Sequence, residues 1–209
     1  MKRILFVRHG STDSNATGVM RGWSDDPLSA LGRRQAKQTA RFLRTLPPAD
    51  YIYSSTLPRS IETAEIIAGH LGLVVHSRDD LRELNLGTLE GGAEHELWNY
   101  FAQQANAEGG LSGMHDVVFP RGESVSNFLA RTQRALSDID RRHAGSILIV
   151  SHGVQTMVAL GVWLEPDLTK WPAYRVDNCS VSEVLFEPAP RLVRLNETRH
   201  LTDNEMRNG

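Results

Sequence analysis

The sequence predicts an α/β fold with a mostly parallel central sheet flanked by helices. Two short apolar runs, residues 4–7 and 147–150, each lead into one polar residue followed by His and Gly. Runs of this kind are typical of strands that are buried on both faces of a parallel sheet. Segments with helical spacing of apolar residues alternate with strand-like runs along the chain, which is the pattern of an α/β protein.

The first half of the chain contains two strand–helix units. Ser29 is a candidate N-cap for the first long helix, which Pro47 ends. Pro58 begins the second, because proline is favoured at the first helical position. The expected elements are, in order, a strand at 4–7, a loop at 10–28, a helix after Ser29, a strand at 51–53, a helix from Pro58, and short strands and turns over 72–90.

The second half repeats this alternation and ends in antiparallel strands. An amphipathic helix is indicated by Val125, Phe128, Thr132, Ala135 and Ile139, which recur at helical spacing. The expected elements are a helix over 93–107, a Gly-containing loop over 108–122, that amphipathic helix, the strand at 146–150, a helix after Gly153, and a terminal hairpin or edge strands at 181–187 and 191–197.

The composition is that of a globular protein and excludes several other classes. Of the 209 residues, 40% are hydrophobic and 23% are charged, which is ordinary for a soluble domain. There are 23 Lys and Arg against 25 Asp and Glu, so nucleic-acid binding has no electrostatic support. The single cysteine, Cys179, excludes an intramolecular disulfide framework and suits a reducing compartment. The N-terminal apolar run is too short for a signal peptide, and no segment approaches a membrane span, so we expect a cytoplasmic protein.

Two histidines and two arginines are predicted to meet at one edge of the sheet. Ligands of open α/β sheets bind outside the carboxyl ends of the strands, and His9 and His152 each follow a buried strand directly. Arg8 adjoins His9, and Arg59 lies in the first turn of the helix that follows the strand at 51–53. The start of that helix also offers free backbone N–H groups to an anion. Because arginines hold phosphate through paired hydrogen bonds, these residues favour a phosphate site.

A reaction follows from these residues together with Glu83. Neutral His9 attacks phosphorus through one ring nitrogen to give a phosphohistidine, while its other ring nitrogen donates to a backbone carbonyl. Arg8, Arg59 and His152 hold the phosphate oxygens as charge develops on them. Glu83 protonates the departing alcohol and later deprotonates the water that cleaves the phosphohistidine. The arginines supply the positive charge, so no metal or other cofactor is required.

Each of these residues alone has an ordinary structural interpretation, such as a core histidine or a solvated helix arginine. Ser151 is disfavoured as a nucleophile because VSHGV lacks the G-x-S-x-G turn. A zinc site of His9, His152 and Glu83 is conceivable, but the two nearby arginines would repel the metal. The prediction therefore depends on the joint pattern.

That joint pattern resembles the histidine phosphatase superfamily, also called the phosphoglycerate mutase-like family, over roughly residues 3–201. The matching blocks are LFVRHGSTDSN, RGWSDDPLSALGRRQA, IYSSTLPRSIETAEII, LRELNLGTLEG, FPRGESVSNFLARTQRAL and ILIVSHGVQTMVAL. The resemblance implies a three-layer sandwich with a small helical cap. Residues 1–201 would form a single histidine phosphatase domain with 91–122 as a cap insertion, and 202–209 would be a polar tail.

The resemblance also implies roles for particular residues. His9 corresponds to the phosphorylated nucleophile and Glu83, rather than Glu90, to the proton donor, with Arg8, Arg59 and His152 completing the catalytic set. The residues implied to bind substrate are Arg8, Gly10, Ser11, Asn15, Arg21, Gly22, Arg59 and Gly153. Position 11 carries Ser where many relatives have Glu.

The cap sequence favours the phosphatase branch of this family over the mutase branch. A mutase must hold a second anionic group, which calls for additional Lys or Arg, yet none occurs between Arg82 and Arg121. That stretch instead contains acidic and large apolar residues, namely Glu94, Glu96, Glu108 and Asp116 with Leu97, Trp98, Tyr100, Phe101, Met114 and Phe119. We therefore expect a phosphatase for a small-molecule phosphomonoester whose remaining part is neutral or apolar. The inference weakens if Arg121 or the loop at 18–26 turns inward over the substrate.

Several alternatives stay open at this point. A mutase-type phosphoryl transfer and a non-catalytic phospho-ligand binding protein are the competing functions. A homodimer is possible through an edge strand near 181–186. Cap residues could contact substrate or simply pack against the core, and these are Trp98, Phe101, His95 and His115.

Overall fold

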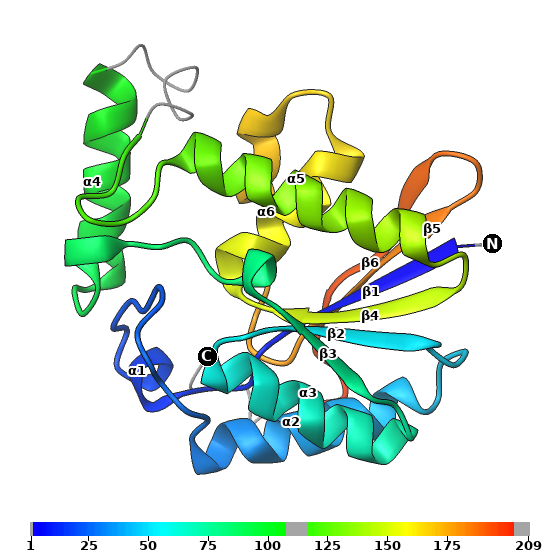
Figure 1. Cartoon of the computed structure of the whole chain (residues 1–209). Coiled ribbons are helices and arrows are strands. Elements are labelled where there is room, and N and C mark those ends of the chain that lie inside the picture. Colours follow the sequence, from blue (N-terminus) through cyan, green and yellow to red (C-terminus); the bar gives the residue numbers. More distant parts are fainter. Residues whose placement is uncertain (1, 108–116, 203–209) are drawn as a thin grey trace.

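The computed structural model of the chain, which describes residues 2–107 and 117–202, is built around a six-stranded sheet with the order β3-β2-β4-β1-β5-β6 (Figure 1). Strands β3, β2, β4 and β1 run parallel, whereas β5 pairs antiparallel with β1 and with β6. The expected α/β class with a mostly parallel sheet is confirmed. The strands are β1 (Lys2–Arg8), β2 (Tyr51–Ser55), β3 (Val75–Arg78), β4 (Ser146–Ser151), β5 (Val181–Phe186) and β6 (Pro190–Glu197).

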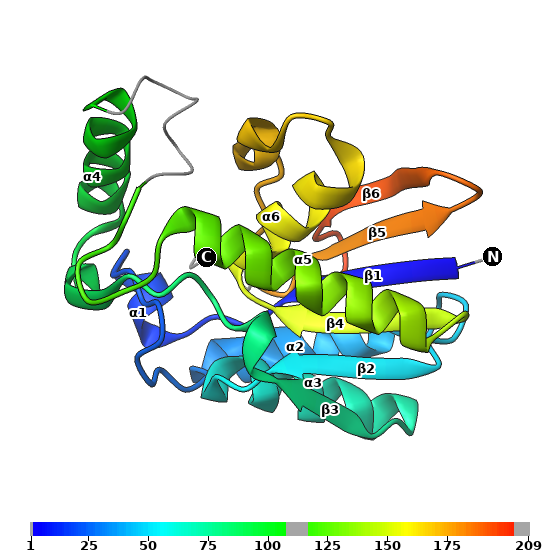
Figure 2. The same cartoon turned by 45° about the horizontal axis from the view of Figure 1, so that its top comes forward.

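Helices cover both faces of this sheet, which gives the three layers that the sequence predicts. Figures 1 and 2 show α2 and α3 on one face and α5 and α6 on the other, while α4 stands beside the sheet. The helices are α1 (Asp13–Ala16), α2 (Ala30–Leu43), α3 (Pro58–Leu71), α4 (Glu94–Ala107), α5 (Val125–Arg142) and α6 (Gly153–Leu164), and short 3-10 helices are η1 (Asp79–Leu81), η2 (Gly87–Leu89) and η4 (Leu168–Ala173).

Successive side chains of the central strands point to opposite faces of the sheet. On β1, Ile4 and Phe6 join a cluster with residues of α5 and α6. Leu5 and Val7 point to the other face and join a cluster with residues of α2 and α3. This double burial explains the continuous apolar runs of β1 and β4, since a strand covered on both faces has no polar side.

A third apolar cluster joins α4 to the body of the protein. Leu97 and Phe101 of α4 are grouped with Phe119, with Phe128 of α5 and with Trp171 of η4. The ring of Phe101 meets that of Trp171 edge-on, with centroids 6.3 Å apart. These contacts fix the helix at the end of the sheet where β1 and β4 finish.

Two details of the expected architecture are wrong. Residues 10–28 are not loop throughout, because Thr12 and Asn15 form a reciprocal capping box that nucleates the short helix α1. The strand at 181–186 is not an edge strand, since β5 lies between β1 and β6. The hairpin places β6 outermost, and the exposed residues Val193 and Leu195 belong to that strand. The expected loop lies partly, and the polar tail almost wholly, outside the described residues.

A further property concerns the helices. Within the described ranges, none is both long enough and apolar enough to cross a membrane.

Candidate active site

His9 and His152 meet at the carboxyl end of the sheet, as predicted. β1 and β4 are paired with Arg8 opposite Ser151, and the backbone N–H of His9 donates to Ser151 O at 2.8 Å. The ring centroids of the two histidines lie 5.2 Å apart. Both side chains are buried, with 4% of His9 and none of His152 exposed.

The ring of His9 is held in one orientation by its two nitrogens. Nδ1 lies 2.8 Å from Gly10 O, and since a carbonyl only accepts, Nδ1 carries the proton. This is the backbone hydrogen bond that the sequence analysis predicted. Nε2 then has a lone pair, which accepts from Nε of Arg59 at 3.2 Å. Burial, followed by the charges of Arg59 and Arg8, keeps the pKa of His9 well below its ordinary value, so the ring is neutral at pH 7.

His152 has the complementary arrangement. Its Nε2 lies 2.8 Å from Ser55 Oγ, which itself accepts from the N–H of Leu57. In the tautomer where the Ser55 hydroxyl donates to Nε2, the proton of His152 is on Nδ1. Nδ1 is buried and has no hydrogen-bond partner among the described residues. In that tautomer Nδ1 is a buried donor beside the ring of His9.

Arg59 is buried, with 2% of its surface exposed. Besides contacting His9, its guanidinium donates through Nη2 to Gly22 O at 2.8 Å and through Nη1 to Ser24 O at 3.3 Å. The loop that carries these carbonyls is fixed from the other side by Glu90, which accepts from the N–H groups of Trp23 (2.6 Å) and Ser24 (3.0 Å) and from the Ser24 hydroxyl. Glu90 thus positions the loop that positions Arg59.

Glu83 is held at the start of α6. One carboxylate oxygen accepts from the N–H of Gln155 and of Leu84, and the other accepts from the N–H of Val154, all at 2.9–3.0 Å. Burial raises the pKa of this carboxyl, against the opposing effects of these hydrogen bonds and of Arg59. A buried carboxyl with a raised pKa keeps its proton to a higher pH than an exposed one, which suits a proton donor.

His9, Arg59 and Glu83 line a cavity of about 390 Å³ between the sheet end and α4, whereas His152 is fully buried behind them and is not among the lining residues. Of the residues predicted for the site, those in the lining are Arg8, His9, Asn15, Arg21, Arg59, Glu83 and Gly153. Arg8 is fixed by donating to Val176 O at 2.8 Å. Asn15 accepts at 3.1 Å from Asn178, which also donates to His9 O at 2.9 Å. Asn178 is a supporting residue that the sequence analysis missed.

Three residues predicted to bind substrate, Gly10, Ser11 and Gly22, are not part of the cavity lining. Ser11 is fully buried and its N–H donates to Gln35 of α2, away from the cavity. A side chain at Gly10 would meet Gly32 O at 2.5 Å, so the absence of a side chain here lets helix α2 approach closely. Gly22 similarly admits Glu90, whose Oε1 lies 2.5 Å from the position of a Cβ. In contrast, a Cβ at Gly153 would lie 3.7 Å from Nε of Arg8, beside the cavity.

Several amides at the helix N-termini are already hydrogen-bonded within the protein. At the start of α3, the N–H groups of Ser60 and Ile61 both donate to Leu57 O. At the start of α6, the N–H groups of Val154 and Gln155 bind Glu83. These four amides are therefore not available to an anion.

Four cations and four carboxylates line the cavity. The cations are Arg8, Arg21, Arg59 and Arg175, and the carboxylates are Asp26, Glu83, Glu94 and Asp177. Arg175 was missed because it follows η4 in a stretch without periodic pattern. Arg21 belongs to the loop at 18–26, so this loop does turn inward toward the cavity. The absence of Lys and Arg between Arg82 and Arg121 is therefore a weaker reason to prefer a phosphatase over a mutase.

The cap residues divide into two groups. Trp98 lines the cavity, whereas Phe101 packs in the apolar cluster beneath it. His95 is exposed and is not part of the lining. His115 lies outside the described residues. Within the described ranges, no three His, Cys, Asp or Glu side chains are grouped as metal ligands.

Comparison with known proteins places this chain in one family. The model of the histidine phosphatase superfamily (branch 1) matches residues 4–198. A probable phosphoglycerate mutase GpmB from Klebsiella pneumoniae is 38% identical over 204 residues, which cover 92% of this chain and 88% of the relative. The α-ribazole phosphatase of Shigella flexneri aligns with a TM-score of 0.79 and 26% identity, over 93% of this chain and 96% of that chain. Phosphoserine phosphatase from Entamoeba histolytica, solved with 3-phosphoglyceric acid, aligns with a TM-score of 0.77 and 27% identity, over 97% and 100%.

Proposed function

Because this chain belongs to the histidine phosphatase superfamily, branch 1, we propose that it is a metal-independent phosphatase that hydrolyses a small phosphomonoester through a phosphohistidine on His9. The observation that carries the proposal is the ring of His9. Its Nδ1 is committed to Gly10 O, and its Nε2 has a lone pair beside Arg59 in the same cavity as Glu83. A neutral imidazole held in this way is a nucleophile.

In the first step, the substrate phosphate replaces His9 as the partner of Arg59 Nε. Nε2 then attacks phosphorus, and the bond from phosphorus to the ester oxygen breaks with its electron pair moving to that oxygen. Glu83 donates its proton to this oxygen, which leaves as an alcohol. Arg8, Arg59 and Nδ1 of His152 stabilise the charge on the three equatorial oxygens.

In the second step, water attacks the phosphohistidine. Glu83, now a carboxylate, takes a proton from the water as the new oxygen–phosphorus bond forms. The nitrogen–phosphorus bond breaks and returns its electron pair to Nε2, so that the product is inorganic phosphate and the initial protonation states are restored.

The charge of the cavity favours a phosphatase over a mutase. Four arginines and four carboxylates line the cavity. When Arg8 and Arg59 hold one phosphate dianion and Glu83 carries the proton that it donates, two arginines remain. The remaining carboxylates are Asp26, Glu94 and Asp177. A mutase must also hold a second phosphate, which this balance disfavours by electrostatic repulsion. The names of the curated relatives support the mutase, which is the second candidate, and the names of the aligned structures support the phosphatase.

The test is phosphate release in the presence of EDTA from p-nitrophenyl phosphate, 3-phosphoglycerate and glycerol 3-phosphate. We expect release by the wild type and a loss of about 10⁴-fold or more in His9→Ala, because a nucleophile is removed. Acid-labile phosphate should be trapped on the wild type but not on this variant.

Two results would replace the proposal. Transfer of labelled phosphate between two substrates without release would make the protein a mutase. Binding of phosphate without turnover of any monoester would make it a phospho-ligand binding protein.

A further inference from the structure

We propose that Arg131 is a positioning residue for the proton transfer, because it fixes the backbone of Glu83 from outside the cavity. The inference rests on the proposed function, in which Glu83 protonates the leaving oxygen. Arg131 lies in the second turn of α5 and is not among the residues that line the cavity. It therefore acts on the reaction only through the residue that it holds.

The proposed acid belongs to a segment without regular secondary structure. Residues 83–86 form neither helix nor strand, and they begin two residues after the end of η1. The backbone groups of such a segment have no strand ladder or helical turn to bind, so their hydrogen bonds come from side chains or from other loops. Those partners decide where the carboxyl of Glu83 lies.

The guanidinium of Arg131 supplies three of these bonds. Nη1 donates to the carbonyls of Asp80 at 3.1 Å and Arg82 at 2.7 Å, and Nη2 donates to the carbonyl of Glu83 itself at 2.7 Å. The remaining N–H groups bind the carboxylate of Glu123, through Nε at 3.0 Å and Nη2 at 2.6 Å. All five donors of the guanidinium are thus used, a number that no other side chain offers.

Glu123 holds the chain on the other side of Glu83. Its Oε1 accepts from the N–H of Asn85 at 2.9 Å, and its own N–H donates to Asn85 O at 3.1 Å. The side chains of Arg131 and Glu123 are only 13% and 14% exposed, so solvent screens their ion pair little. The ring of Phe128 lies against the guanidinium, with its centroid 4.7 Å from the central carbon. One ion pair therefore fixes the backbone immediately before and immediately after the proposed acid.

The carboxylate of Glu83 is fixed by a different helix. Its oxygens accept from the N–H groups of Val154 and Gln155 at the start of α6. The residue is thus held by α5 through its carbonyl and by α6 through its side chain, and its carbonyl also accepts from Nε1 of Trp23 at 2.7 Å. A displacement of about 1 Å in a catalytic group can cost roughly 10²-fold in rate. Loss of the α5 contacts should therefore impair proton donation even though no group in the cavity has changed.

The experiment compares a substrate that needs a proton on its leaving group with one that does not. kcat/KM is measured for glycerol 3-phosphate and for p-nitrophenyl phosphate, because this parameter compares the transition state with the free enzyme and substrate. We expect Arg131→Gln to lose at least about ten-fold more on glycerol 3-phosphate than on p-nitrophenyl phosphate, since only the first leaving group depends on the acid.

Two milder variants make the same comparison if Arg131→Gln does not fold. Arg131→Lys keeps the positive charge but has three donors instead of five, so it should lie between the wild type and Arg131→Gln in the ratio of the two kcat/KM values. Glu123→Gln keeps an acceptor for the N–H of Asn85 but removes the negative charge that holds Arg131. It should change the ratio in the same direction.

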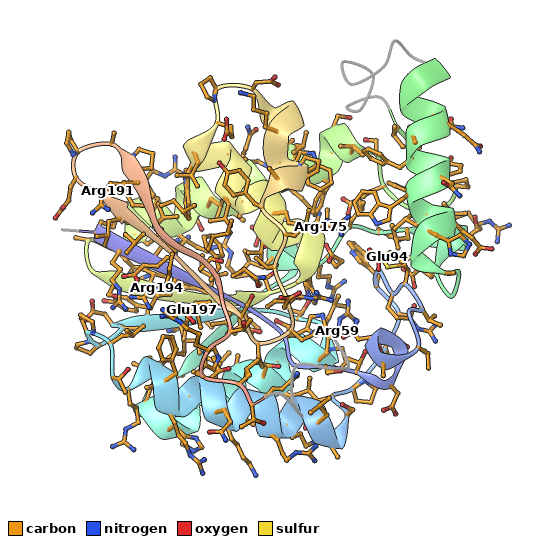
Figure 3. The ribbon with its side chains drawn as sticks, turned by 180° about the vertical axis from the view of Figure 1, so that it is seen from behind. Arg59, Glu94, Arg175, Arg191, Arg194 and Glu197 are labelled. Carbon is orange, nitrogen blue, oxygen red and sulfur yellow. The ribbon has the colours of Figure 1, made fainter. Side chains whose placement is uncertain are left out.

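Arg194→Gln is the matched control for loss of an ion pair. Arg194 binds a buried carboxylate, that of Glu183, at 2.6 Å, and its guanidinium lies 5.9 Å from the centroid of Phe42. Figure 3 shows Arg194 on β6, well away from Arg59 and the cavity. The control should lose stability in urea unfolding, as Arg131→Gln does, and yet keep the wild-type ratio of the two substrates.

The proposal is overturned if the variants of Arg131 and Glu123 lose activity on both substrates equally or on neither. It is also overturned if Arg194→Gln changes the ratio as much as Arg131→Gln, because the effect would then follow stability alone. Hydrolysis of both substrates with an unchanged ratio removes only this inference, whereas a wild type that hydrolyses neither substrate removes the proposed function together with it.

Discussion

Protonation states of individual residues decide the chemistry of this site. His9 is neutral because burial and two arginines lower its pKa, and Glu83 is more readily protonated because burial raises its pKa. The two shifts go in opposite directions, which widens the pH range in which the nucleophile is free and the acid still holds its proton.

Replacing Glu83 with Gln separates substrates by their leaving group. We expect a loss of about 10²–10⁴-fold in kcat/KM for an alkyl phosphate, since general acid catalysis contributes roughly that factor. The loss on p-nitrophenyl phosphate should be much smaller, because p-nitrophenolate leaves without a proton.

The pH profile adds a second readout for this variant. In the wild type, kcat/KM for the alkyl phosphate should fall as pH rises through the raised pKa of Glu83, where the acid loses its proton. Glu83→Gln should lack that limb. Equal losses on both substrates, with the limb retained, would assign the proton to another group.

The role of a residue could be predicted from the sequence only where the adjacent residues determine its position in the fold. His9 and His152 follow buried strands, so their meeting at one sheet edge was predictable from strand polarity. Arg175 follows η4 in an irregular stretch, and its approach to Trp98 depends on how α4 packs, which no local pattern encodes. Ser11 and Gly10 lie outside the cavity lining, because adjacency to His9 in sequence does not say which way the backbone turns.

At the scale of elements, one close backbone contact connects the site to helix α2. The segment that follows β1 rests on the first turn of α2, where a Cβ at Gly32 would lie 2.1 Å from Ser11 O. Both groups belong to the backbone, so a side chain here displaces one element from the other. The outer position of β6, in contrast, depends on which strand of the hairpin pairs with β1, and the sequence pattern does not distinguish these choices.

Alanine substitutions at two helix glycines test this crossing. Gly32→Ala should reduce the free energy of unfolding by about 1–3 kcal/mol through overpacking. Gly69→Ala in α3 is the matched control, since nothing lies within 4 Å of its Cβ position, and it should stabilise by about 0.5–1 kcal/mol. Urea unfolding of the two variants measures both changes. If Gly32→Ala leaves the free energy of unfolding unchanged, the segment after β1 and helix α2 can move apart without cost.

At the scale of the whole molecule, the buried histidines connect folding to pH. The pKa of His152 is lowered well below 6.5 by burial first and then by Arg59. Below pH 6.5 the unfolded chain binds a proton that the folded protein excludes. The free energy of unfolding is therefore largest above that pH and falls as the pH is lowered toward the folded-state pKa.

His152→Gln should make stability less dependent on pH. Below pH 6.5 one excluded proton corresponds to a slope of about 1.4 kcal/mol per pH unit. We expect the variant to lose less stability than the wild type when urea unfolding is repeated from pH 7.5 to 5.5. Glu83 is present in both proteins, so its opposite contribution cancels in the comparison. If the free energy of unfolding depends on pH equally in the two proteins, His152 is protonated in the folded state as readily as in the unfolded chain.

The segment from Glu83 to Glu90 determines where a chimera with a relative should be joined if the region of α4 is to be exchanged. Its first residue lines the cavity as the proposed acid, its backbone carbonyl at Glu83 accepts from the indole of Trp23, and its last residue anchors the loop that orients Arg59. A chimera joined upstream of Glu90 would import a foreign anchor and disturb the arginine together with the cap. A junction placed after Glu90 would exchange α4, with Glu94 and Trp98, and leave the phosphate-binding residues as one unit.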